Sequence, residues 1–301
     1  MKITNISEKR FNSLKPFELP NNIFNTEGQM YIYTEKEKWE TKEYVMKKLY
    51  RDMGTFFSNK LYTVNELIDR KEDIGIEELV MPEKLISVHG KIVGFISRKR
   101  ENINFQTVLD SSEFTNSQKI EYFKEIGRIL ENMRNIRVYS TLTDFYLNDL
   151  HENNFILNTK TGKINVVDMD SCKINGNLPF PARYLSPISL INSVSKYKRV
   201  EENSIIGECF KIDENTEYYC YIVMILNYLY GNRITSLSIE EYYNYLTYLH
   251  SIGVSYELID KLALIYTEHD NINVYEYIDE LSKLDGRTNY RVYDHIRRKI
   301  K

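Results

Sequence analysis

Three polar residues in the middle of the chain have the types and the spacing that phosphoryl transfer requires. Asp149 lies in a polar stretch, Asn154 follows five residues later, and Asp168 follows fourteen residues after Asn154, near the end of an apolar run. Phosphoryl transfer needs a carboxylate that orients and deprotonates the attacking hydroxyl, and oxygen ligands that hold Mg²⁺ on the phosphates. An Asp on a loop, an Asn nearby and a second Asp after a hairpin can supply these parts.

A short hairpin is predicted between Asn154 and Asp168. Phe155–Leu157 and Ile164–Val167 are apolar runs separated by a turn sequence at Thr161-Gly162, a pattern that indicates strand, turn and strand. The hairpin makes the spacing more specific than any one of the three polar residues alone.

The sequence pattern of residues 28–97 predicts short strands and one helical stretch. The expected strands are Gln29–Thr34, Lys42–Tyr50, Leu85–Val88 and Lys91–Ser97, because these runs are rich in Tyr, Val and Ile. His89-Gly90 is expected to form a tight turn between the last two strands.

From about residue 115 onward the chain is expected to be mostly helical. The clearest helix is Ser117–Ile136, where apolar residues recur at three- and four-residue spacing, and Thr115 with Gln118 is a candidate capping box at its start. Residues 215–230 are apolar nearly all round, which indicates a helix buried on every side. Further helices are expected near residues 239–250, 256–267 and 274–284, with caps at Ser238, Ser255 and Asn273.

The central motif resembles that of the protein-kinase-like family. That family has Asp-x-x-x-x-Asn in its catalytic loop, then a hairpin, then an Asp-Phe-Gly metal motif; this chain has Asn148-Asp149-Leu150-His151-Glu152-Asn153-Asn154 and Asp168-Met169-Asp170. The resemblance implies that Asp149 is the catalytic base and that Asn154 and Asp168 bind magnesium. Asp170 stands where the family has Gly, and it is either a further metal ligand or a solvated acid.

The N-terminal region fits the same resemblance. Tyr44-Val45-Met46-Lys47 matches the strand whose lysine holds the phosphates, and Glu66 follows nineteen residues after Lys47. Glu66 is therefore expected to pair with Lys47. The alternative is that Thr63 and Glu66 form a capping box at the start of a helix. Since alternation puts Lys47 and Lys48 on opposite faces of a strand, one of them is expected to be solvated.

Nucleotide contacts are expected at two further places. Phe95, Ile96 and Ser97 end the last strand before a hinge near residues 97–102, under which adenine would lie. Gly28 is all that remains of the glycine-rich loop in Asn25-Thr26-Glu27-Gly28-Gln29-Met30. It is either a phosphate-contacting residue or an ordinary turn glycine.

Other features depart from the protein kinases. Asn148 replaces the Arg before the catalytic Asp, so control by a phosphorylated activation loop is not expected. His151 makes the motif similar to the aminoglycoside, choline and lipopolysaccharide-sugar kinases; its simpler interpretation is a structural hydrogen bond in the loop. Tyr184-Leu185-Ser186-Pro187 resembles the end of an activation segment, but Ile188 replaces the Glu that follows it.

The resemblance implies an α+β, two-lobed protein-kinase-like fold. Its N-lobe would be an antiparallel sheet with one helix, and its C-lobe would be mainly helical. The expected divisions are an N-terminal extension at residues 1–27, the N-lobe at 28–97, a hinge at 98–104 and the C-lobe at 105–301.

The implied function is ATP- and Mg²⁺-dependent phosphoryl transfer to a hydroxyl. A protein Ser/Thr kinase is favoured by Tyr184-Leu185-Ser186-Pro187 and by the lack of an obvious inserted small-substrate module. One alternative is a small-molecule or sugar kinase. The other is a pseudokinase that binds nucleotide or acts as a scaffold, because several family residues are missing, although Lys47, Asp149, Asn154 and Asp168 are all retained.

Charge, apolar runs and cysteine content bear on the expected partners and location of the protein. The net charge of −3 gives no general field for nucleic acid, and the longest apolar run, Tyr218–Tyr230, is shorter than the ~20 residues of a membrane span. Three cysteines form no Cys-x-x-Cys pair, and the first ten residues lack the apolar stretch of a secretory signal. A reduced, cytoplasmic location is therefore expected.

Overall fold

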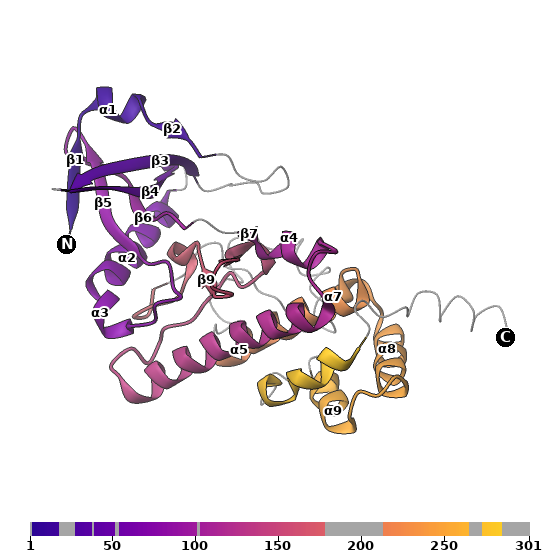
Figure 1. Ribbon diagram of the computed structural model, residues 1–301. Helices are drawn as coiled ribbons and strands as arrows, with labels where there is room; N and C mark the ends of the chain where they lie inside the picture. Colours follow the sequence, from indigo (N-terminus) through magenta and orange to yellow (C-terminus); the bar gives the residue numbers. More distant parts are fainter. Residues whose placement is uncertain are drawn as a thin grey trace. The chain divides into compact units, whose positions relative to one another are not determined.

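The computed structural model has the mixed α+β architecture that the sequence predicts (Figure 1). It describes residues 2–17, 28–37, 39–51, 54–100, 103–177, 213–264 and 273–284.

The chain divides into two compact units. The first comprises residues 1–105, 132–149 and 153–183, and the second comprises residues 106–131, 150–152 and 184–301. The lobe limits expected from the sequence remain a prediction.

A six-stranded sheet dominates the first unit. Its strands are β1 (Ile3–Ile6), β2 (Lys15–Pro16), β3 (Gly28–Glu37), β4 (Glu40–Leu49), β5 (Pro82–Val88) and β6 (Lys91–Arg98), in the order β1-β5-β6-β4-β3-β2. All four strands expected from the sequence are confirmed. The turn between β5 and β6 is confirmed as well, because His89 and Gly90 have φ angles of 50° and 72° and join Val88 to Lys91, as a two-residue hairpin loop requires.

The sheet is mixed, so the expectation of a purely antiparallel sheet is wrong at one edge. β1 runs parallel to β5, with Ile3 opposite Leu85 and Ile6 opposite Val88. The other pairings are antiparallel. The strand was missed because Ile3-Thr4-Asn5-Ile6 is short and buries only its last residue.

The helices of this region also exceed the single one expected. α1 (Glu8–Asn12) follows β1, and α2 (Thr55–Asp69) is followed at once by the short α3 (Lys71–Ile74). α3 ends at Gly75, whose φ of 60° is left-handed, a conformation that glycine adopts at low cost.

Apolar side chains cover both faces of the six-stranded sheet. One cluster consists of Ile6, Tyr33, Tyr44, Met46, Ile86 and Ile96, and the other joins Leu49, Leu85 and Phe95 to Val64 and Ile68 of α2. Successive residues of β4 alternate between these faces. Lys47 accordingly lies buried on the α2 side, whereas the Lys48 ammonium lies 5.5 Å from the centre of the Phe11 ring on the other. The two lysines lie on opposite faces as expected, but Lys48 is half-buried rather than solvated.

A three-stranded sheet carries the predicted hairpin. It consists of β7 (Ile103–Asn104), β8 (Phe155–Leu157) and β9 (Ile164–Val166), with β8 in the middle. The 3₁₀ turns η2 (Glu152–Asn154) and η3 (Met169–Ser171) precede and follow the hairpin. The Val80 N–H donates to the Val166 carbonyl at 2.8 Å, so β9 is tied to the segment that leads into β5.

The helices predicted from the sequence are confirmed. They are α5 (Asn116–Tyr139), α7 (Glu214–Tyr230), α8 (Ile239–Ser251), α9 (Tyr256–Leu264) and the 3₁₀ helix η5 (Tyr275–Lys283), and residues 265–267 of the expected 256–267 helix lie outside the described residues. The short helices α4 (Phe105–Asp110) and η4 (Ile234–Ser236) were not predicted. The capping box of Thr115 and Gln118 is formed, as is one at Ser238. α7 is buried on nearly every side, as its composition indicates.

The strand that carries Lys47 depends on a close backbone approach at Gly94. A Cβ atom added at Gly94 of β6 would lie 2.0 Å from the Lys47 carbonyl oxygen of β4. Gly94→Ala is therefore expected to push the two strands apart and to destabilise the protein by about 1–3 kcal/mol, as overpacking does. Urea unfolding followed by circular dichroism measures this loss.

Gly90→Asn is the matched control for that substitution. Gly90 lies in an open turn with a left-handed φ, which Asn tolerates. The unfolding midpoint of Gly90→Asn should therefore stay near that of the wild type. Equal midpoints for the two variants would contradict the argument from strand packing.

Candidate functional site

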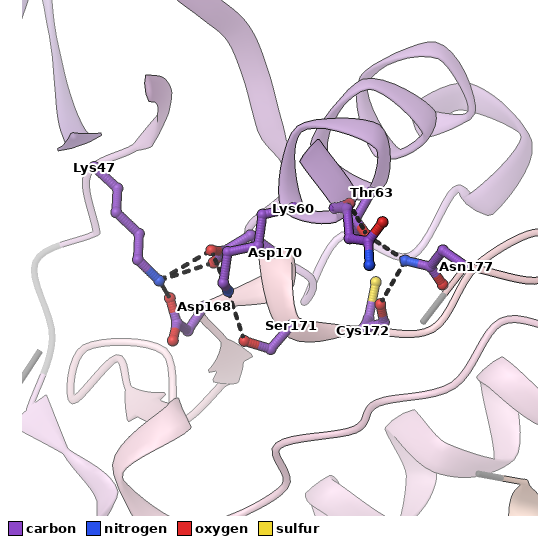
Figure 2. A network of polar contacts seen from close by, with 9 residues as sticks. Lys47, Lys60, Thr63, Asp168, Asp170, Ser171, Cys172 and Asn177 are labelled. Carbon is purple, nitrogen blue, oxygen red and sulfur yellow. Dashed lines mark hydrogen bonds and ion pairs between the residues drawn. The ribbon is translucent and has the colours of Figure 1, made fainter. Parts of the chain in front are cut away.

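Two lysines and two aspartates form a buried ionic cluster in the first unit (Figure 2). Lys47 Nζ lies 2.6 Å from Asp168 Oδ1 and 3.0 Å from Asp170 Oδ2. Lys60 Nζ lies 2.8 Å from the same Asp170 Oδ2. The name ionic cluster is used below for Lys47, Lys60, Asp168 and Asp170.

Three elements bring these side chains together. Lys47 comes from β4 and Lys60 from α2, and the two aspartates come from the turn after β9. Asp168 has a left-handed φ of 60° and directly precedes η3, in which Asp170 lies. Asp adopts this conformation more readily than most residues, and the tight turn lets both carboxylates contact Lys47.

The two carboxylates differ in exposure and in pKa. The Asp170 side chain is fully buried, whereas that of Asp168 is 33% exposed. Burial alone would raise the pKa of Asp170, but the ammonium groups of Lys47 and Lys60 hold it well below its usual range. Burial raises the pKa of Asp168 to about 6; Lys47 opposes this shift and the Asp170 carboxylate adds to it. Asp168 is thus the carboxylate of the cluster that a ligand can reach.

The hairpin pairs Asn154 with Val167, the residue before Asp168 of the ionic cluster. The Val167 N–H donates to the Asn154 carbonyl at 2.9 Å, one residue before Asp168. The Asn154 Nδ2 donates to the Asp149 carbonyl oxygen at 2.7 Å. These two hydrogen bonds link Asn154 to Asp149 and to the residue before Asp168. The side-chain Nδ2 of Asn154 is engaged, and its side-chain Oδ1 is the atom suited to a cation.

Glu66 does not take the place expected for it. Its carboxylate accepts a hydrogen bond from Asn175, and the carboxylates that contact Lys47 are those of Asp168 and Asp170. The alternative capping box is wrong as well, because α2 begins at Thr55 and Thr63 lies in its interior. The Thr63 hydroxyl donates to the Asn59 carbonyl at 3.1 Å instead.

The residues expected to contact nucleotide lie in the sheet. Gly28 begins β3 rather than forming a turn, and a Cβ there would lie 2.2 Å from the Lys48 carbonyl oxygen. Phe95 and Ile96 are buried on opposite faces of β6, and Ser97 is half-buried next to the end of that strand. Gly28 is thus explained by strand packing, and Phe95 and Ile96 by the core.

Other residues of the motifs lie as follows. Asn148 is buried and Asp149 and His151 are half-buried. The segment Tyr184–Pro187 and the following Ile188 lie outside the described residues.

Lys60 is the site residue that the sequence did not reveal. The apolar face of α2 carries Val64, Leu67 and Ile68, and Lys60 occupies the position four residues before Val64 on that face. A lysine at an apolar-face position signals a buried ionic partner. That partner, Asp170, was expected either to bind metal or to be solvated; it is fully buried between the two ammonium groups.

Within the described ranges, no three His, Cys, Asp or Glu side chains gather as a metal site. Magnesium does not require such a set, because it commonly takes one or two protein oxygens and completes its shell with phosphates and water. Asn154 and Asp168 are chemically suited to that partial set.

None of the described helices is long and apolar enough to cross a membrane. No protein-family model matches the chain, and no curated protein is significantly similar to it.

Proposed function

We propose that this protein is an ATP- and Mg²⁺-dependent phosphotransferase with a two-lobed protein-kinase-like fold. The observation that carries the proposal is the contact of Lys47 with Asp168 at 2.6 Å, at the end of the hairpin that starts from Asn154. The elements follow one another in the order that the resemblance implies. The strand that carries Lys47 is followed by a helix, two strands, a polar loop, a hairpin and Asp168.

The charges of the site suit a nucleotide with its magnesium ion. The Lys47 ammonium would bind the α- and β-phosphates, and the oxygens of Asn154 and Asp168 would hold the ion. An ion held there would supply positive charge that offsets the charge of the phosphate oxygens. Adenine would lie near Ser97, at the end of β6.

Asp149 would act on the acceptor. Its carboxylate would orient the attacking hydroxyl and accept its proton as the oxygen bonds to the γ-phosphorus. The bond from the γ-phosphorus to the bridging oxygen breaks, and ADP leaves with that electron pair. Little other covalent chemistry is required of the protein, since positioning and charge stabilisation dominate phosphoryl transfer.

For the acceptor, we propose a protein Ser or Thr hydroxyl. The segment Tyr184-Leu185-Ser186-Pro187 favours it, because it resembles the end of a protein kinase activation segment. His151 favours the alternative of a small-molecule hydroxyl, because it makes the motif similar to the aminoglycoside, choline and lipopolysaccharide-sugar kinases.

The test is transfer of label from γ-labelled ATP in the presence of magnesium, with the wild type and Asp149→Asn compared. We expect the variant, which keeps the shape of the side chain but not its basicity, to lose about 10²- to 10⁴-fold in rate. A cell extract, separated into protein and metabolite fractions, serves as the source of acceptors.

Each outcome of this assay has a distinct meaning. Label in a protein band that depends on Asp149 supports a protein kinase, and label confined to small molecules supports a metabolite kinase. Binding of ATP without any transfer of label would overturn the proposal and leave a nucleotide-binding scaffold.

A further inference from the structure

Lys60 is a buried cation on the face of α2 that packs against the sheet. Its side chain is only 1% exposed, and its neighbours on this face, Val64 and Leu67, are fully buried. Burial of an ammonium group is costly unless it is paired and hydrogen-bonded. A lysine at this place therefore calls for an explanation beyond packing.

Asp170 links Lys60 to Lys47. Lys60 Nζ donates to Asp170 Oδ2 at 2.8 Å and to Ser171 Oγ at 3.2 Å. Lys47 Nζ donates to the same carboxylate, at 3.0 Å to Oδ2 and 3.1 Å to Oδ1 (Figure 2). Because one oxygen accepts from both lysines, a shift of Lys60 is expected to move Asp170, which is one of the two carboxylates that hold Lys47.

Building on the proposed function, we infer that Lys60 is a positioning residue for the nucleotide phosphates. It fixes Asp170, and Asp170 fixes the ammonium of Lys47 where the phosphates are to bind. This Lys60–Asp170–Lys47 bridge replaces the direct ion pair expected between Glu66 and Lys47, so α2 acts on the phosphate-binding lysine through a residue of η3.

The rival explanation is that Lys60 only ties α2 to the segment after β9. Two other contacts make such ties without involving Lys47: Asn177 Nδ2 donates to Thr63 Oγ1, and Asn175 Nδ2 donates to Glu66. Thr63→Val removes the first of these and provides a matched control from the same helix. A structural role predicts similar effects of Thr63→Val and Lys60→Met, whereas a positioning role predicts different ones.

The test compares the KM for ATP of the wild type, Lys60→Met, Lys60→Arg and Thr63→Val. We expect Lys60→Met to raise the KM roughly 10- to 100-fold, the range typical of a lost supporting contact behind a ligand-binding residue. Lys60→Arg, which keeps the cation, should restore most of the affinity, and Thr63→Val should leave the KM near that of the wild type. An unchanged KM in Lys60→Met, or an equal rise in Thr63→Val, would overturn the inference.

A second measurement does not depend on ATP turnover. The free energies of unfolding of Lys47→Met, Lys60→Met and the double variant form a cycle. If the two lysines share Asp170, the double variant should lose more stability than the sum of the single losses, because each single variant keeps one ammonium beside the buried carboxylate. If the loss of stability in the double variant equals the sum of the single losses, the inference that the two lysines share Asp170 is overturned. If the wild type transfers no phosphate, the proposed function fails while this cycle still decides whether Lys60 acts on Lys47.

Discussion

Asp168→Asn should abolish the proposed phosphoryl transfer while leaving the fold intact. The substitution keeps the size of the side chain but removes the charge proposed to hold magnesium. Loss of one charge-stabilising part of a phosphoryl-transfer site costs on the order of 10³- to 10⁵-fold in rate. The fold is expected to tolerate the change, because the Asp168 side chain is one-third exposed and Lys47 keeps its contacts with Asp170.

Two measurements on the same sample check this prediction. Single-turnover transfer from γ-labelled ATP gives the rate, and thermal unfolding gives the stability. A rate within tenfold of the wild type would contradict the role of Asp168, and unfolding of the variant would contradict the expectation that the fold stays intact. Asp144→Asn is a suitable control, because Asp144 pairs with Lys173 at 2.6 Å outside the ionic cluster and carries no proposed role in transfer.

Local sequence patterns predicted the parts of this site that depend on strand geometry. The alternation of β4 places Lys47 and Lys48 on opposite faces whatever the rest of the chain does. The hairpin between Asn154 and Asp168 follows in the same way from two apolar runs and a turn. Both expectations required only residues that are close in the sequence.

Local patterns could not predict contacts between residues that lie far apart in the sequence. The partner of Lys47 depends on the rotation of α2 and on the conformation of the turn after β9, where Asp168 takes a left-handed φ. The spacing from Lys47 favoured Glu66, yet Asp170 fills that place. β1 was missed for a similar reason, since its pairing with β5 is made across the chain by a segment that buries only Ile6.

Asp170→Asn should destabilise the protein far more than Asp168→Asn. The carboxylate is fully buried and is shared by Lys47 and Lys60, whose side chains are 4% and 1% exposed. Removing one member of a buried ionic group costs about 3–5 kcal/mol, because the remaining charges lose the partner that offset their burial. For a protein of this size, that loss corresponds to a fall in melting temperature of roughly 10 °C.

Glu35→Gln is the matched control, because it breaks an ion pair of the same unit that is only partly buried. Lys84 Nζ lies 2.6 Å from Glu35 Oε2, with side chains 32% and 15% exposed, and solvent screening should limit the loss to about 1 kcal/mol or less. Urea unfolding of both variants gives the comparison. Equal losses would show that Asp170 contributes no more than a peripheral acid. A large loss in Asp170→Asn together with a small one in Asp168→Asn would separate two adjacent carboxylates into one that holds the lysines in place and one that is left to meet the ligand.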